Sequence, residues 1–363
     1  MAKEKMKIAI CSISKNEAKF VKRFCDSAAD ADLILIADTG SEDDTVSIAK
    51  ECGATVYNIC VTPWRFDHAR TAAIALLPKD IDVVIALDLD EVLEEGWRAE
   101  IERCWVVGKT TRLRYMFDWG HGKVFQHEKI FARHGYFFFH PCHEIPRADK
   151  RITEDFAYTD KLLVSHYPDD TKSRGQYLDL LKLSVEEDPY CPRNAWYYAR
   201  ELYYYREWDK AIERIEKYLD MPNSLWKAER SYAMRVMSEC YNAKGDKQAA
   251  EEWLHKAAVE DPTARESWIA LADLTGNQHR WAESFAYAMK ALSITHRVYV
   301  YTSDPNAWGY RPHDLAAIAA YRLGLTDIAI EQGKLALSFA PDDERLKANM
   351  DWYDPVHYDL AAE

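Results

Sequence analysis

The stretch VVIALDLDEVLEEGW, which runs from Val83 to Trp97, joins a continuous apolar segment to a cluster of carboxylates. A segment that is apolar at every position predicts a strand buried on both faces, as in a parallel sheet. Side chains two positions apart in a strand point the same way, so we expect Asp88 and Asp90 to face one side at the end of this strand. Two carboxylates about 4 Å apart repel by roughly 4 kcal/mol at an effective dielectric constant near 20. A divalent cation bound between them and other anions would offset that repulsion.

The flanking sequence alternates between apolar strands and amphipathic helices, which predicts a parallel sheet covered on both faces. We expect Asn16 and Ser41 to cap the first two helices. Asp38 ends the second strand, so it should lie at the same carboxyl edge as Asp88, where open α/β sheets bind ligands. From residue 110 to 141, aromatic-rich segments indicate antiparallel strands and turns. The predicted strands are 7–14, 32–38, 54–60 and 82–90, and the predicted helices are 16–31, 41–53 and 66–77.

Beyond about Thr171 the sequence has helical spacing and an internal repeat. Ala250 and Ser284 lie 34 residues apart, which is the period of a tetratricopeptide repeat. The neighbouring intervals are 39 and 45 residues, and the longest contains an aromatic-rich insertion at 295–312 that we expect to reach the mouth of the site at the sheet edge. We therefore divide the chain into an α/β domain at 1–170 and an all-α repeat domain at 171–363. The recurring residues are Ala211 and Tyr218, then Ala250, Ala257 and Pro262, then Ser284 and Ala291, then Ala329, Ala336 and Pro341.

The composition is that of a globular protein and excludes some classes of function. The net charge is -13 and both halves are acidic, so the chain lacks the electrostatic footprint of tight non-specific nucleic-acid binding. No apolar run approaches the roughly 20 residues of a membrane span, and the N-terminus lacks the pattern of a signal peptide. The eight cysteines include no Cys-x-x-Cys pair, which indicates free thiols in a reducing compartment. We expect a cytoplasmic protein.

Several motifs resemble those of family 2 glycosyltransferases of the GT-A fold, in the same order and at about the same spacing. They are CSISKNEAKFVKRF at 11–24, LIADTGSEDDT at 35–45, RFDHARTAAI at 65–74 and IALDLDE at 85–91, and the resemblance covers about residues 7–170. The later segments HPCHEIP and LLVSHYPDDTKSRGQYLDLL are similar to a bacterial and phage subgroup in which tetratricopeptide repeats follow the catalytic domain. Thr71 and Lys129 depart from that subgroup, which often has asparagine and arginine there.

This resemblance implies an N-terminal GT-A domain, a Rossmann-like mixed α/β sheet, and a C-terminal all-α repeat domain. It implies an inverting, metal-dependent transfer of a sugar from a nucleotide-diphosphate donor, most often a UDP-sugar. Mn²⁺ or Mg²⁺ would act as a Lewis acid on the departing diphosphate, and both suit oxygen ligands. Asp90 would bind the metal directly, with His166 as a further ligand and His143 as the alternative. The residues expected to bind the donor are Ser12, Asp38, Arg70, Asp88 and Trp119.

An inverting transfer also needs a base that takes the proton of the acceptor. Glu144 is the first candidate and Asp118 is its competitor. The acceptor stays open between a protein or peptide, a glycan or lipid-linked precursor, and a modified base in phage DNA, which the acidic halves disfavour. Repeats of this type commonly hold peptides, which favours a protein or peptide.

Two other functions compete with this reading. The first is an inactive transferase-like domain joined to a repeat array that serves as a binding scaffold. The intact residues Asp38, Arg70, Asp88 and Asp90 count against it. The second is a sugar-phosphate nucleotidyltransferase, which usually has a glycine-rich loop near the N-terminus, whereas residues 11–20 contain no glycine.

Overall fold

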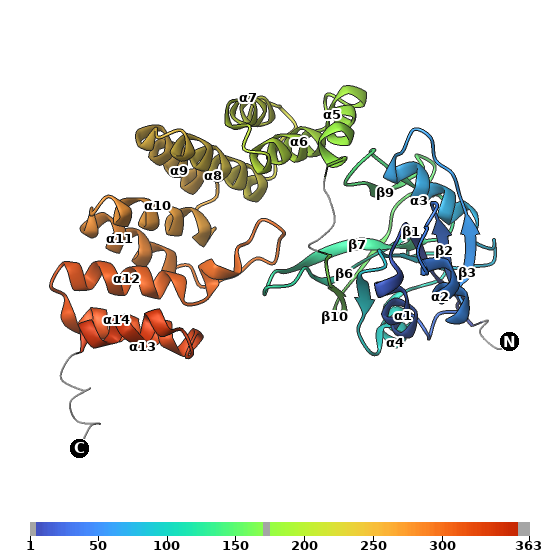
Figure 1. The fold of residues 1–363 in the computed structure, drawn as a ribbon, viewed down its shortest axis with the longest axis horizontal. Helices are drawn as coiled ribbons and strands as arrows, with labels where there is room; N and C mark the ends of the chain where they lie inside the picture. Colours follow the sequence, from blue (N-terminus) through green and yellow to red (C-terminus); the bar gives the residue numbers. More distant parts are fainter. Residues whose placement is uncertain (1–4, 170–174, 355–363) are drawn as a thin grey trace, which may run out of the picture. The chain divides into compact units, whose positions relative to one another are not determined.

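The computed structural model describes residues 5–169 and 175–354, and the chain divides into two compact units, Met1–Asp188 and Pro189–Glu363 (Figure 1). The first unit contains the sheet and the second contains helices stacked in chain order. All eight cysteines carry free thiols, as predicted. No helix of the described residues is both long and apolar enough to cross a membrane.

The helix α5 (Tyr177–Glu187) belongs to the first unit. Arg65 donates a hydrogen bond of 2.5 Å to Glu187, and the ring centroids of Phe66 and Tyr177 lie 5.9 Å apart. The predicted division after residue 170 therefore falls before this helix. Helical spacing identifies a helix but does not tell which unit it packs against.

The first unit is built on an eight-stranded mixed sheet with the order β3-β2-β1-β4-β7-β6-β10-β5. Strands β1 to β4 are parallel to one another, β7 is antiparallel to β4 and β6, and β10 is parallel to β6. The carboxyl ends of β1, β2, β3, β4, β6 and β10 consequently share one edge. The strands are β1 (Ile8–Ser14), β2 (Leu33–Asp38), β3 (Thr55–Asn58), β4 (Val83–Ala86), β5 (Glu91–Leu93), β6 (Arg112–Asp118), β7 (Val124–Ala132) and β10 (Phe156–His166).

Helices cover both faces of this sheet, as the apolar strands predict (Figure 1). Residues alternate between the two faces along β1, so that Ile8 and Ile10 belong to one core cluster, whereas Ala9 and Cys11 belong to the other. The first cluster lies under α1 (Ala18–Ser27), α2 (Thr45–Glu51) and α4 (Trp97–Cys104). The second lies under α3 (Phe66–Ala75) and a separate hairpin of β8 (Tyr136–Phe139) and β9 (Ile145–Ala148).

Two predicted helix caps and one predicted strand end are wrong. Helix α1 begins at Ala18 and α2 at Thr45, each a few residues beyond the predicted cap. The Asn16 side chain instead accepts from the N–H of Glu42, and the Ser41 hydroxyl accepts from the N–H of Asn16. These side chains hold two loops together. A helix-cap pattern considers only residues near each other in sequence, so it does not predict hydrogen bonds between two loops. Strand β4 ends at Ala86, so the Asp-x-Asp motif lies in the following turn rather than in the strand.

The second unit consists of antiparallel helix pairs that follow one another along the chain (Figure 1). The pairs are α6 (Pro192–Tyr204) with α7 (Trp208–Leu219), α8 (Lys227–Ala243) with α9 (Lys247–Glu260), α10 (Arg265–Asn277) with α11 (Trp281–Leu292), and α12 (Arg311–Arg322) with α13 (Thr326–Phe339). The helix α14 (Glu344–Tyr353) packs on α13, and a short 3₁₀ helix, η1 (Pro305–Trp308), precedes α12.

The repeat positions found in the sequence are confirmed as packing positions. All of the recurring small residues lie on the second helix of a pair and are at most 1% exposed, so neighbouring helices approach closely there. Pro262 and Pro341 follow the last residues of α9 and α13 and cannot continue those helices. Stacked pairs of this kind bury a continuous core that a single pair could not bury.

Two glycines of the first unit form a matched test of close packing. Gly135 and Gly53 both have positive φ, +87° and +84°, but a Cβ at Gly135 would lie 2.5 Å from Cγ1 of Ile152, whereas a Cβ at Gly53 meets no atom within 4 Å. We expect Gly135→Ala to lower the free energy of unfolding clearly more than Gly53→Ala, which adds only about 1 kcal/mol of backbone strain. Urea denaturation measures both. Equal losses would show that Ile152 moves aside freely.

Candidate active site

The shared carboxyl edge collects the polar side chains that end or follow the parallel strands. Asp38 ends β2, Asp88 follows β4, Asp118 ends β6 and His166 ends β10. Open α/β sheets bind ligands at this edge, so the topology alone makes it the candidate site. The register sets these residues beside one another: Ser14 pairs with Asp38, Ser165 with Asp118, and His166 with Glu91.

Asp38 shapes the loop that follows β2. Its Oδ1 accepts from the hydroxyls of Ser14 at 2.8 Å and Ser41 at 2.5 Å, and its Oδ2 accepts from the N–H groups of Gly40 at 3.0 Å and Ser41 at 2.9 Å. Burial disfavours the charged form, but the hydrogen bonds from Ser41, Ser14 and Gly40 outweigh it and lower the pKa of Asp38. An ionised carboxylate therefore fixes the loop at the sheet edge.

Arg70 forms the centre of a buried ion cluster. Its side chain is 6% exposed; its Nη2 donates to Asp88 and its Nε donates to Glu144. Burial opposes the charge of Arg70, but the two carboxylates outweigh burial and raise its pKa. Burial likewise opposes ionisation of Asp88, and the charges of Arg70 and Lys129 overcome it and hold the pKa of Asp88 well below its usual range.

Lys129 and Glu91 complete this cluster. The Nζ of Lys129 lies 3.2 Å from Oδ2 of Asp88 and 3.1 Å from Oε1 of Glu91, and the other Glu91 oxygen accepts from the N–H of Asp88 at 3.0 Å. Burial, together with the charge of Asp88, raises the pKa of Glu91 against the effect of Lys129. Asp88 is thus paired with two protein cations, each of which it shares with a second carboxylate, Glu144 or Glu91.

Asp90 has a different partner from Asp88. Its Oδ2 lies 3.4 Å from Nε2 of His166, and its carbonyl oxygen accepts from the N–H of Tyr167 at 2.8 Å. Burial lowers the pKa of His166, but the hydrogen bond and charge of Asp90 outweigh burial, so the net direction is upward. The Nδ1 of His166 is buried and has no hydrogen-bond partner among the described residues. The structure thereby brings together two residues that the resemblance assigned to a metal.

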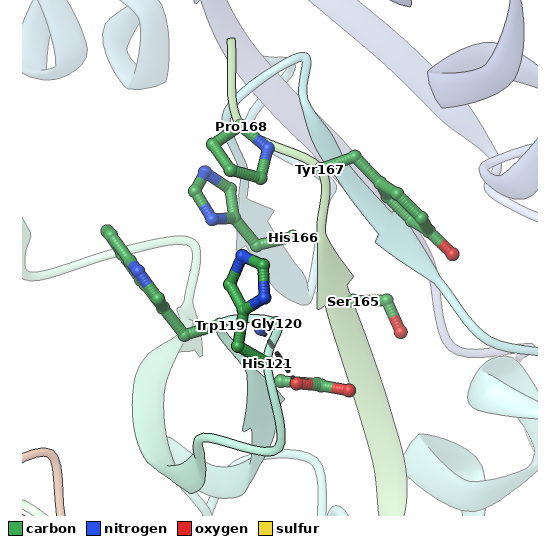
Figure 2. Close-up of a pocket in the computed structure, with 8 residues that line it drawn as sticks. Trp119, Gly120, His121, Ser165, His166, Tyr167 and Pro168 are labelled. Carbon is green, nitrogen blue, oxygen red and sulfur yellow. Dashed lines mark hydrogen bonds between the residues drawn. The ribbon is translucent and has the colours of Figure 1, made fainter. Parts of the chain in front are cut away.

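A pocket of about 360 Å³ opens beside this pair, at the ends of β6 and β10. Figure 2 shows the rings of Trp119, His121 and His166 gathered on one side of β10, whereas Ser165 and Tyr167 extend from its other side. The ring centroids of Trp119 and His166 lie 4.5 Å apart, and Trp119 remains 49% exposed. Asp118 also lines the pocket, and its Oδ1 accepts from the N–H of Gly120 at 2.8 Å. The pocket therefore offers an exposed indole, an imidazole and a carboxylate.

Of the predicted site residues, Asp118, Trp119 and His166 line this pocket, and the other seven do not, Ser12, His143 and Glu144 among them. Ser12 is 1% exposed within β1, and its hydroxyl donates to the carbonyl oxygen of Ile13 at 3.2 Å. His143 packs against α5, with its ring centroid 5.9 Å from that of Tyr177. Glu144 is bound to Arg70, as described above, and its side chain is only 9% exposed.

Sequence reasoning missed the roles of Ser14, Lys129 and Glu91. Ser14 lies two positions after Ser12 on the same strand and reaches Asp38 because the parallel register places the two strand ends together. Lys129 lies in the middle of β7. From the sequence it was noted only as a lysine at a position where the resembling subgroup often has arginine, and its ion pairs were not predicted. The sequence signal for Glu91 was its position directly after the Asp-x-Asp motif. A third carboxylate at that position is also typical of a solvent-exposed turn, so the signal did not identify a buried ion pair.

The donor set at this edge fits a divalent cation only in part. A carboxylate and an imidazole, Asp90 and His166, offer one oxygen and one nitrogen ligand of the kind that Mn²⁺ accepts. Within residues 5–169 and 175–354, no three histidine, cysteine, aspartate or glutamate side chains are arranged to hold a metal ion. A cation here would need further ligands from a bound anion, as is usual for Mg²⁺ shared with phosphates.

Comparison with known proteins supports the repeat part of the chain. No protein-family profile matches the chain. A TPR repeat-containing protein of Synechococcus elongatus is 36% identical over 93 residues, which are 25% of this chain and 22% of that protein. The chain thus spans about a fifth of the length of this relative. The match and the buried repeat positions identify the helical unit as TPR-like.

Solved structures of several TPR proteins are similar at low sequence identity. PilF of Pseudomonas aeruginosa is 15% identical with a TM-score of 0.38, over 47% of this chain and 70% of that one. YrrB, described as a TPR protein with an unusual peptide-binding site, is 15% identical with a TM-score of 0.39, over 49% of this chain and 84% of that one.

Removal of the Arg70 guanidinium tests the ion cluster. We expect Arg70→Met to lower the free energy of unfolding by about 3 kcal/mol, because it leaves Glu144 buried and unpaired and leaves Asp88 with Lys129 alone. The matched control is Arg151→Met, since Arg151 is 87% exposed and pairs with Asp149, which is 35% exposed, at the surface, where little change is expected. Chemical denaturation compares the two. Similar small losses would contradict a central role for Arg70.

Proposed function

We propose that the N-terminal unit is a metal-dependent glycosyltransferase that moves a sugar, with inversion, from a nucleotide-diphosphate donor, preferably a UDP-sugar, to an acceptor. The observation that carries the proposal is the pairing of Asp90 with His166 at the carboxyl edge of the sheet, directly beside the pocket of Trp119 and Asp118. The resemblance to family 2 glycosyltransferases assigns metal binding to the same two residues from sequence motifs alone.

The charges at this edge explain why such a donor would need a cation. The carboxylates of Asp88, Asp90, Glu91 and Glu144 outnumber the cations Arg70 and Lys129, and only Asp90 lacks an arginine or lysine partner among the described residues. A diphosphate that approaches this edge would meet excess negative charge. Asp90 and His166 would hold Mn²⁺ or Mg²⁺, which would supply Lewis-acid stabilisation of the leaving nucleoside diphosphate.

The residues around the cation would position the donor. Asp38, through Ser41 and Gly40, holds the β2 loop where the nucleotide would bind. Arg70 and Lys129 fix Asp88 at the start of the turn that contains Asp90, so the geometry of the turn does not depend on a ligand. The exposed face of Trp119 would stack on the sugar or the acceptor.

The inverting step needs a base, and the structure favours Asp118 over Glu144 for it. The acceptor oxygen would attack the anomeric carbon while the bond to the diphosphate breaks, and the acceptor proton would pass to the base. Asp118 lines the pocket, whereas Glu144 is held in an ion pair with the buried Arg70. The Glu144 side chain is only 9% exposed in that ion pair and therefore lies less open to an acceptor.

Binding of UDP tests the cation site. We expect UDP at a hundred times its Kd, with Mn²⁺, to stabilise the protein by about 2.7 kcal/mol. Asp90→Asn should abolish the Mn²⁺-dependent part of the thermal shift, because it removes a charged ligand. Asp160→Asn, which removes an exposed carboxylate elsewhere on β10, should leave the shift unchanged. Absence of any Mn²⁺-dependent shift with UDP in the unaltered protein would reject the proposal and favour a binding scaffold.

Turnover of UDP-sugars separates the two base candidates. We expect Asp118→Asn to lower kcat by about 10²- to 10⁴-fold with little effect on UDP binding, because it removes the proton acceptor but no donor ligand. Glu144→Gln should act mainly on stability, since it weakens the ion pair with Arg70. Mass spectrometry of the products measures turnover against a panel of donors. Unchanged kcat in Asp118→Asn would return the role to Glu144.

A further inference from the structure

The insertion between α11 and α12 packs against the first helices of the repeat pairs. The links between other helices are short, such as the four residues 261–264 between α9 and α10, whereas residues 293–310 separate α11 from α12 (orange in Figure 1). The described contacts of this insertion include helices of its own unit: Tyr301 and its neighbours contact α6, α8 and α10, and η1 packs on α10 and α12. The expectation that this insertion reaches the active-site mouth stays a prediction.

Tyr301 is the anchor of this insertion. Its hydroxyl accepts from Nε1 of Trp196 at 2.9 Å and donates to the carboxylate of Glu229, which is 7% exposed. The other Glu229 oxygen accepts from the hydroxyl of Tyr218 at 3.0 Å. Burial raises the pKa of Glu229, and the hydroxyls of Tyr301 and Tyr218 act against that rise. A carboxylate and an indole N–H are thus both directed at one phenol oxygen.

Aromatic rings enclose the phenol ring of Tyr301. The ring centroids of Tyr197, Trp226 and Tyr232 lie 6.2, 5.5 and 6.5 Å from that of Tyr301. Tyr197 stacks at an interplanar angle of 22°, whereas Tyr232 meets the ring edge-on at 73°. Together with Trp196 and Glu229, these residues form what we call the Tyr301 pocket.

The helices also bind the backbone on both sides of Tyr301. Nη2 of Arg235 donates to the carbonyl oxygen of Thr302 at 3.1 Å, and Oε1 of Glu266 accepts from the N–H of Asp304 at 2.9 Å. Further along, Nε of Arg265 donates to the carbonyl oxygen of Ile294 at 2.7 Å. Recognition of main-chain groups around one anchoring side chain is a way in which a surface binds a peptide segment.

We propose that the surface formed by α6, α8 and α10 is a binding site for a peptide that carries a tyrosine at a turn, and that residues 294–304, which precede η1, fill this site in the unliganded chain. A tyrosine-bearing peptide from another molecule would bind by displacing Tyr301 from its pocket. The inference concerns the second unit alone and does not depend on the proposed transferase activity.

The contacts determine which side chain the pocket accepts. Without the hydroxyl, the N–H of Trp196 would lose its acceptor and the buried carboxylate of Glu229 would lose one of its two hydroxyl donors. A site that hydrogen-bonds a hydroxyl rejects the analogue that lacks it, because the buried polar groups are left unpaired. Phenylalanine is therefore disfavoured at this position. The neighbouring Val298 and Tyr299 are 51% and 47% exposed and add little to the anchoring.

Chemical rescue of a cavity tests the pocket in the full chain. In Tyr301→Ala, p-cresol should bind and raise Tm, and toluene, which has no hydroxyl, should bind at least about tenfold more weakly. The unaltered protein is the control and should show neither effect, because Tyr301 fills the site. Failure of p-cresol to stabilise Tyr301→Ala, or equal binding of toluene, would overturn the proposal.

A peptide titration tests recognition of the backbone. A synthetic peptide of residues 296–309 should bind a variant whose residues 296–304 are replaced by a glycine-serine linker, and its phenylalanine version should bind at least about tenfold more weakly. The intact chain should bind the same peptide about a hundredfold more weakly, because its own segment competes at a millimolar effective concentration.

Two results of the titration would overturn the proposal. One is absence of binding to the linker variant, and the other is equal affinity for the linker variant and the intact chain. Should the linker variant fail to melt cooperatively, the peptide is titrated into Tyr301→Ala instead. If the peptide binds Tyr301→Ala and p-cresol displaces it, the proposal is supported. If the peptide does not bind, the proposal is overturned.

Discussion

The buried guanidinium of Arg70 is the interaction on which the rest of the first unit's site depends. It extends from α3 on one face of the sheet, and it binds one carboxylate after β4 and another after the β8–β9 hairpin's first strand. Three segments distant in sequence are therefore tied at one point. Because ionisation of Asp88 is already balanced by Arg70 and Lys129, the turn that follows β4 is set before any ligand arrives. Pre-organisation of this kind lowers the entropic cost of binding.

The sequence predicts the framework of this protein better than the details of its site. Buried strands and repeated helix faces can be predicted because each of their buried positions requires an apolar or small residue. The apolar runs and the 34-residue interval therefore show directly in the sequence. The pairing of Ser14 with Asp38, or of Lys129 with Glu91, depends on which strands become neighbours, and β7 enters the sheet between β4 and β6. The turn at Asp88 has a local cause, because the N–H of Glu91 donates to the carbonyl oxygen of Asp88 at 3.0 Å and the N–H of Asp88 donates to the Glu91 carboxylate at 3.0 Å. His166 could be chosen beside Asp90 only through the family resemblance.

Charge is divided between the two aspartates of the Asp-x-Asp motif. Asp88 is paired with Arg70 and Lys129, although its side chain is 38% exposed, whereas Asp90 faces an imidazole that carries charge only when protonated. In the proposed transferase, this division leaves one carboxylate available to a cation and one committed to the shape of the turn. Neither aspartate could take the place of the other, although the motif is symmetric in sequence.

The bond between Trp196 and Tyr301 spans 105 residues and has a consequence for how the helical array comes apart. Arrays of stacked repeats usually behave as chains of nearest neighbours, in which end repeats fray independently. A tie from the first pair to a segment after the third makes fraying at α6 costly unless that segment is released as well. The middle of this array should therefore melt as one block, and loss of the tie would return it to stepwise opening.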